Sequence, residues 1–173
     1  MLRTEFPTNN KICQLLGKVD IYFAGLQNII EFYIWEIVNP ADQTMGQAIT
    51  AEMQFRSIVG LANTVFQHKF GHDVQKVKKF SSLLNRAERM GRERNDYIHA
   101  IYGAGNTPND LARMRNTARN GQGLKHEAVI ITESMLEDFI RRISELAGDF
   151  HAFMPQVFVF KKVASASDLN LRG

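Results

Sequence analysis

The stretch that decides the fold is DVQKVKKFSSLLNRAERMGRERNDYIHAIY, residues 73–102. Its apolar residues recur at steps of three and four, which is typical of an amphipathic helix, and Asp73 suits the cap of the first turn. At 100° per residue, Arg94 lies at the centre of the apolar sector. The apolar residues that share this sector are Leu83, Ala87, Met90, Ile98 and Ile101. The stretch therefore predicts a helix with an arginine on its apolar face.

The flanking sequence predicts three more helices. Apolar residues recur at helical spacing over residues 11–38, 43–70 and 132–154. Pro40 follows the first of these segments and Pro155 follows the last, and neither residue can continue a helix. Thr132 suits the N-cap of the last helix. The chain is thus expected to form a bundle of four helices.

A β-hairpin is expected between the third and fourth helices. The segments LARMRNTAR (111–119) and LKHEAVII (124–131) flank the turn residues NGQG, and the segment 103–110 is rich in loop-forming residues. The predicted fold class is therefore all-α, a four-helix bundle with a small β-hairpin inserted between helices 3 and 4.

Length and composition indicate one globular domain. The 173 residues are 45% hydrophobic and 23% charged, which is enough for a sizeable core and excludes a wholly disordered chain. We expect a single helical domain over residues 1–154 and a partly flexible C-terminal tail over 155–173. The short apolar run in this tail is expected to dock on the domain or to pair as a strand. One cysteine excludes an intramolecular disulfide framework and a cysteine-rich zinc site. No signal peptide or membrane-spanning stretch is recognisable, so we expect a cytoplasmic protein.

Charge is unevenly distributed along the chain. Residues 72–126 carry eleven Lys or Arg and five Asp or Glu, a balance of +6, whereas the rest of the chain has a balance of −3. The basic third is either solvated helix surface or a patch that meets phosphate.

Arg94 itself has three interpretations. An unpaired charge in a core costs several kcal/mol, so this arginine needs a partner or a wet cleft. It forms a buried salt bridge, or extends its charged end to solvent, or binds phosphate together with Asn95 and His99. Asn95 and His99 are four residues apart and share a second face of the helix.

The segment ERNDYIHAIYG, residues 93–103, resembles the signature of HEPN-domain proteins. That signature is an arginine, often followed by a polar residue, with a histidine four to six residues beyond it, near the end of a late helix of a helical bundle. Arg94, Asn95 and His99 match it, and the broader resemblance covers about residues 10–154. Two other arginine–histidine pairs satisfy the loose spacing. Arg92 to His99 starts on the polar face, and Arg119 to His126 straddles the predicted turn.

The resemblance implies a metal-independent endoribonuclease without a cofactor, acting as a homodimer in which two copies of the motif converge. RNA would be cleaved by attack of its own 2′-hydroxyl, leaving a 2′,3′-cyclic phosphate. His99 would act as general acid or base, and Arg94 would stabilise charge on the phosphate. Asn95 would position the phosphate or hold the geometry of the cleft. The resemblance also raises a role as a toxin or defence effector, with an antitoxin or nucleotidyltransferase as partner.

Two alternatives to the ribonuclease stay open. One is a catalytically silent HEPN-like module that binds RNA or nucleotides or scaffolds a dimer. The other is a structural helical dimer in which Arg94 is only an ion-pair partner.

Other charged and reactive residues have weaker interpretations. The residues expected to hold the RNA backbone are Arg92, Arg113, Arg115, Arg119 and Lys125, and further basic residues precede the motif at Lys76, Lys78, Lys79, Arg86 and Arg89. His68 and His72 have the spacing of metal ligands on a helix, but Gly71 interrupts it, so no metal site is predicted. Cys13 is expected to be a small core residue.

Overall fold

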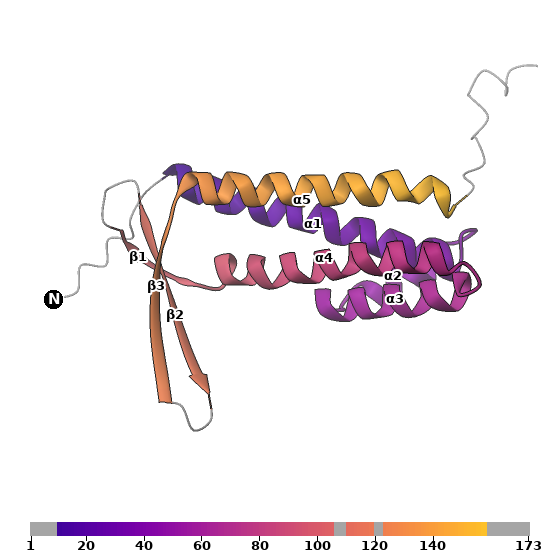
Figure 1. Cartoon of the computed structure of the whole chain (residues 1–173), viewed down its shortest axis with the longest axis horizontal. Coiled ribbons are helices and arrows are strands. Elements are labelled where there is room, and N and C mark those ends of the chain that lie inside the picture. Colours follow the sequence, from indigo (N-terminus) through magenta and orange to yellow (C-terminus); the bar gives the residue numbers. More distant parts are fainter. Residues whose placement is uncertain (1–9, 106–109, 120–122, 159–173) are drawn as a thin grey trace, which may run out of the picture.

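The computed structural model describes residues 10–105, 110–119 and 123–158, and for residues 10, 104, 115–119 and 123–127 it describes the backbone alone. This part of the chain is mostly helical and carries a small antiparallel sheet (Figure 1). The elements, in order, are α1 Asn10–Val38, α2 Thr44–Thr50, α3 Phe55–Phe70, α4 Val74–Ile98, β1 Ile101–Ala104, β2 Leu111–Arg119, β3 Gly123–Ile131 and α5 Glu133–Phe153, followed by a 3₁₀ turn at Met154–Gln156.

Helix α1 is the central element of the helical part. It packs against α2, α3, α4 and α5, and α4 in turn packs against α3 and α5. One face of α1 is buried along its length, and the residues on it include Ile12, Leu15, Val19, Phe23, Leu26, Ile30, Tyr33 and Ile34. This spacing of three and four residues is the pattern that predicted the helix, so the expectation for 11–38 is confirmed.

An aromatic cluster around Tyr33 joins α1 to the other long helices. The Tyr33 ring lies 5.0 Å from that of Phe80 on α4 and 5.9 Å from that of Phe150 on α5, centroid to centroid. The Tyr33 hydroxyl donates a 2.7 Å hydrogen bond to the Phe150 carbonyl oxygen, which satisfies its polar end inside the core. Phe158 lies 5.3 Å from the same ring, so the first residues after α5 pack on the core. The rest of the expected tail, 159–173, lies outside the described residues.

The prediction of one helix over 43–70 is wrong. The chain forms α2 and α3, separated by residues 51–54, and Gln54 is extended at the start of α3. The cause is a contact with α1: the buried Thr50 hydroxyl accepts a 2.9 Å hydrogen bond from the Trp35 indole. A Cβ at Gly46 would lie 2.7 Å from Trp35 Cδ1, so α2 crosses α1 too closely for a larger residue. After this contact, the chain turns and α3 packs along α1 separately.

The prediction that the third helix extends to residue 102 is also wrong. Helix α4 ends at Ile98, and residues 101–104 form β1, which pairs antiparallel with β2. Ile101, expected on the apolar helix face beside Arg94, is 58% exposed on the sheet. The Tyr102 hydroxyl donates a 2.6 Å hydrogen bond to the Tyr97 carbonyl oxygen, which holds β1 against the last turn of α4. The residues expected as a loop therefore begin with a strand.

The expected hairpin is confirmed as β2 and β3, so the sheet has the order β1-β2-β3 in the described residues. Leu111 and Ile131 pair across the two strands, and both are buried against the helices. Beyond this pair, β2 and β3 extend away from the helices as a two-stranded arm (Figure 1).

Both predicted N-caps are present. The Asp73 carboxylate accepts a 3.0 Å hydrogen bond from the Lys76 amide, and the Thr132 hydroxyl accepts one from the Met135 amide. Within the described ranges, no helix is both long enough and apolar enough to cross a membrane.

Replacing Tyr33 by Phe is expected to lower the free energy of unfolding by about 0.5–1.5 kcal/mol at neutral pH, the typical net contribution of one hydrogen bond. The loss is small because the Phe150 carbonyl keeps its bond from the Met154 amide. Burial raises the pKa of Tyr33, so the hydroxyl stays protonated in the folded chain. Its contribution is complete below the unfolded pKa of about 10 and is lost as the pH rises above that value.

The measurement is urea unfolding of the wild type and Tyr33→Phe between pH 7 and 11. The wild type should lose more stability above pH 10 than the variant does. Tyr22→Phe, at an exposed position of α1, is the control. Equal slopes for the wild type and Tyr33→Phe would contradict the assignment.

Candidate functional site

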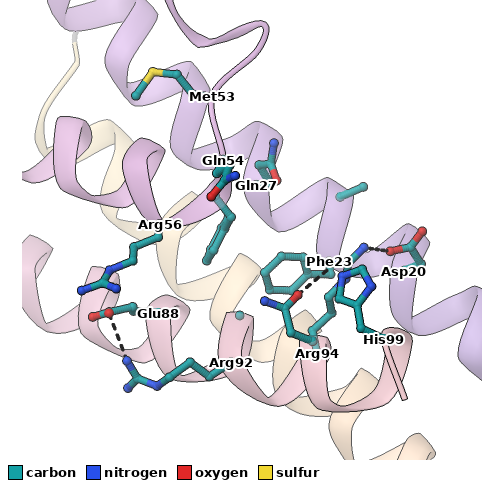
Figure 2. A pocket seen from close by; sticks show the side chains of 14 residues that line it. Asp20, Phe23, Gln27, Met53, Gln54, Arg56, Glu88, Arg92, Arg94 and His99 are labelled. Atoms are coloured by element: carbon teal, nitrogen blue, oxygen red, sulfur yellow. Dashed lines mark hydrogen bonds and ion pairs between the residues drawn. The ribbon is translucent and has the colours of Figure 1, made fainter. Parts of the chain in front are cut away.

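A pocket of about 850 Å³ opens between α1, the start of α3 and the last three turns of α4 (Figure 2). Helix α4 and its C-terminal cap contribute Arg94, Asn95 and His99 to its wall. The residues that line the pocket are Asp20, Phe23, Ala24 and Gln27 from α1, Met53, Gln54, Phe55 and Arg56 at the start of α3, Glu88, Gly91, Arg92, Arg94 and Asn95 from α4, and His99 at the cap of α4. The structure thus brings the predicted catalytic residues and Arg92 to one cavity.

The neighbours of Arg94 fix the rotation of α4. Glu93 points to α5, where Arg142 binds its two carboxylate oxygens at 2.5 and 3.0 Å. Tyr97 is buried, and its ring lies 5.3 Å from that of Phe139 on α5. With these residues facing α5, Arg94 is directed toward α1.

Arg94 has both a partner and a place in the pocket wall. Its Nη2 forms an ion pair with the Asp20 carboxylate, and its Nη1 donates a 3.1 Å hydrogen bond to the Asn95 side-chain oxygen (Figure 2). The guanidinium carbon lies 5.7 Å from the centre of the Phe23 ring, a cation–π distance. The Arg94 side chain is 22% exposed. The ion pair and the hydrogen bond therefore compensate the two terminal nitrogens of the guanidinium at the edge of the pocket, whereas Nε is buried without a hydrogen-bond partner among the described residues.

His99 lies at the C-terminal cap of α4. Its backbone amide donates a 3.1 Å hydrogen bond to the Asn95 carbonyl oxygen, which closes the last turn. The residue is exposed and lines the pocket together with Arg94 (Figure 2). An exposed imidazole can exchange protons with solvent and with a bound ligand, as a general acid or base must.

The pocket carries a cationic surplus. Three arginines line it, against the carboxylates of Asp20 and Glu88. Asp20 pairs with Arg94, and Glu88 pairs with Arg92 at 3.0 Å. Within the described residues, Arg56 makes no ion pair or hydrogen bond and is exposed. An anionic ligand would therefore meet one uncompensated guanidinium at the α3 side of the cavity.

The other predicted RNA-binding residues do not line this pocket. Arg113, on β2, lies with its guanidinium carbon 5.4 Å from the centre of the Tyr97 ring. The β2–β3 arm contains the backbones of Arg115, Arg119 and Lys125. The structure describes only the backbone at these three positions. Lys76 stands 18 residues before Arg94, which is about 27 Å along a helix.

Two further interpretations of the sequence concern Cys13 and a metal site. Cys13 is exposed on α1, so its expected place in the core is wrong. Among the residues with described positions, no group of three or more His, Cys, Asp or Glu side chains is arranged to hold a metal ion.

Several pocket residues were not predicted as site residues from the sequence. Asp20, Phe23 and Gln27 are ordinary members of α1, and Arg56 follows the unpredicted break between α2 and α3. The only signal for Asp20 was indirect, since a charge on an apolar helix face requires a partner somewhere.

Comparisons of this chain with family models, with curated proteins and with solved structures find no match.

Gly91 lets the Phe55 ring pack directly against the backbone of α4 in the wall of the pocket. A Cβ at this position would lie 2.8 Å from two ring carbons of Phe55 and 3.5 Å from Phe23 Cζ. Gly91→Ala is therefore expected to push the Phe55 ring and to cost about 1–3 kcal/mol in overpacking. The better helix propensity of alanine offsets only about 1 kcal/mol of this cost.

The check is urea unfolding beside a matched variant, Gly148→Ala on α5, where nothing lies within 4 Å of the added Cβ. Gly148→Ala should be at least as stable as the wild type, whereas Gly91→Ala should be less stable. If both gained the same stability, the close contact at Gly91 would be refuted.

Proposed function

We propose that this chain is a metal-independent endoribonuclease of the HEPN type, built on a four-helix bundle of α1, α3, α4 and α5. The observation that supports it most is that Arg94, Asn95 and His99 line one pocket and that Arg94 hydrogen bonds to Asn95. The resemblance of residues 93–103 to the HEPN signature supports the same function.

In the proposed reaction the 2′-hydroxyl of one ribose attacks the adjacent phosphorus. The new bond between O2′ and phosphorus closes a 2′,3′-cyclic phosphate as the bond to the 5′-oxygen of the next nucleotide breaks. A general base takes the 2′-hydroxyl proton, and a general acid gives a proton to the leaving 5′-oxygen. His99 performs one of these transfers, while the Arg94 guanidinium stabilises the charge that builds on the phosphate oxygens. Asn95 holds Arg94 in position.

The proposed enzyme is a homodimer. Two proton transfers use two groups, and His99 is the one histidine among the described residues of the pocket. A symmetric partner would supply a second copy of Arg94 and His99 across a twofold axis. We place this enzyme in the cytoplasm with RNA as its substrate, and its role is that of a toxin or defence effector whose partner is an antitoxin or a nucleotidyltransferase.

A second candidate function is a silent HEPN-like dimer that binds RNA or nucleotides, or acts as a scaffold. The ion pair between Arg94 and Asp20 favours it, because a guanidinium that is already neutralised attracts a phosphate less strongly. The two candidates differ in whether RNA is cleaved.

His99→Ala is expected to slow RNA cleavage by about 10²–10⁴-fold, the usual effect of losing one general acid or base. The assay incubates the purified full chain with mixed single-stranded RNA in EDTA and identifies the ends of the products. The wild type should leave 2′,3′-cyclic phosphate and 5′-hydroxyl ends. His151→Ala, at an exposed position near the end of α5, should cleave like the wild type.

Arg94→Gln should be similarly slow but still folded, which circular dichroism would verify. Cleavage at wild-type rate by His99→Ala would eliminate the proposed site. RNA binding without cleavage by the wild type would select the silent dimer. If only Arg94→Gln lost function and it also failed to fold, Arg94 would be an ion-pair partner alone.

A further inference from the structure

The pocket is much larger than the phosphate that Arg94 and His99 would contact. Arg56, across the cavity from the motif, brings the uncompensated guanidinium (Figure 2). Arg92 on α4 and His99 at its C-terminal cap are seven residues apart, or about 10 Å along the helix axis. The cavity therefore has one end at Arg94 and His99 and another at Arg56 and Arg92.

The rest of the pocket wall has a different composition. It contains the half-buried Phe55, whose ring lies 4.6 Å from that of Phe23, and the side-chain amides of Gln27 and Gln54. Aromatic faces stack on unpaired bases, and amides hydrogen bond to base edges. This section suits a nucleobase better than it suits a third phosphate.

A second groove of about 470 Å³ lies beside the pocket, between α3 and α4. Arg56 and Glu88 line both cavities, so the two are adjacent. The polar residues that line the groove include Asn63, Gln67, Ser81 and Asn85. A ligand held at Arg56 can therefore extend beyond the pocket, which favours a strand over a free mononucleotide.

We propose that Arg56 binds the phosphate next to the one held by Arg94 and His99, and that the unpaired nucleotide between these two phosphates fills the pocket. The inference rests on the proposed function for the identity of the first phosphate. It adds a binding residue outside the HEPN-like motif and specifies single-stranded RNA as the substrate, because a base that is paired in a duplex cannot enter the cavity.

The test measures binding without cleavage. A short fluorescein-labelled 2′-O-methyl oligouridylate lacks the attacking hydroxyl, so the proposed reaction cannot consume it, and its dissociation constant follows from fluorescence anisotropy. Arg56→Gln should weaken binding about 5- to 10-fold. The slope of log K against log salt should fall by about 0.7, the value for one lost contact with a single-strand phosphate.

Arg89→Gln is the matched control. Arg89 is an exposed arginine of α4 that lines a different cavity, and within the described residues it also makes no ion pair. The change removes the same charge and should weaken binding less than about 2-fold, because Arg89 lines a cavity on the α5 side of α4 and the solvent screens an exposed charge that does not contact the ligand. An abasic oligomer of equal length and charge should bind the wild type several-fold more weakly than the oligouridylate.

Three results would overturn the inference: equal losses for Arg56→Gln and Arg89→Gln, no binding by the wild type, or equal affinity for the abasic oligomer. The proposed function fails separately, when the wild type does not cleave unmodified RNA or when His99→Ala cleaves it as fast. Cleavage that depends on His99, with binding indifferent to Arg56, would leave the ribonuclease standing and remove the second phosphate position.

Discussion

The charge of Arg94 on the apolar face of α4 must be compensated where this helix meets α1. A guanidinium cannot lose its proton in a protein, so burial alone would cost several kcal/mol. The ion pair with Asp20 and the contact with the Phe23 ring meet this need from α1. The Asp20 side chain stays 54% exposed, so the ion pair lies at the rim of the pocket and not in the core. The position of one cation in a helical pattern thus places an ion pair in the pocket wall.

The same helix end divides its side chains among three neighbours. Glu93 and Tyr97 bind and pack against α5, Arg94 turns to α1, and Asn95 and His99 face the cavity. Five of the seven residues from Glu93 to His99, about two helical turns, therefore set the orientation of α4 against two helices and leave a polar face free. The bidentate pair of Glu93 with Arg142 resists rotation of the helix, since a small turn would break both hydrogen bonds. Such rigidity suits groups that must hold a fixed geometry around a ligand.

The sequence pattern was sufficient to predict the elements that depend on interactions between residues close in sequence. The helices around Arg94, Tyr33 and Phe139, the caps at Asp73 and Thr132 and the pairing of β2 with β3 follow from periodicity, hydrogen-bonding side chains and turn residues. The break before α3 did not follow, because it is imposed by Trp35 on another helix. Ile98, Ile101 and Tyr102 fit helical spacing, and the pattern alone cannot show that Tyr102 bonds back to Tyr97. Arg94, Asn95 and His99 could be predicted to lie together because they are close in sequence at the end of one helix. Asp20 and Arg56 reach the pocket only through the packing of α1 and α3, which the sequence pattern does not show.

Only His99 and Ala100 separate the last helical residue of α4 from the first residue of β1. The Tyr102 hydroxyl and the Arg113 guanidinium both fasten the sheet to Tyr97, two residues before His99. The sheet is therefore joined to the end of the helix by a connection of two residues and by two side-chain contacts with Tyr97. The turn that carries the imidazole is thus positioned from two sides, by the helix before it and by the base of the sheet after it.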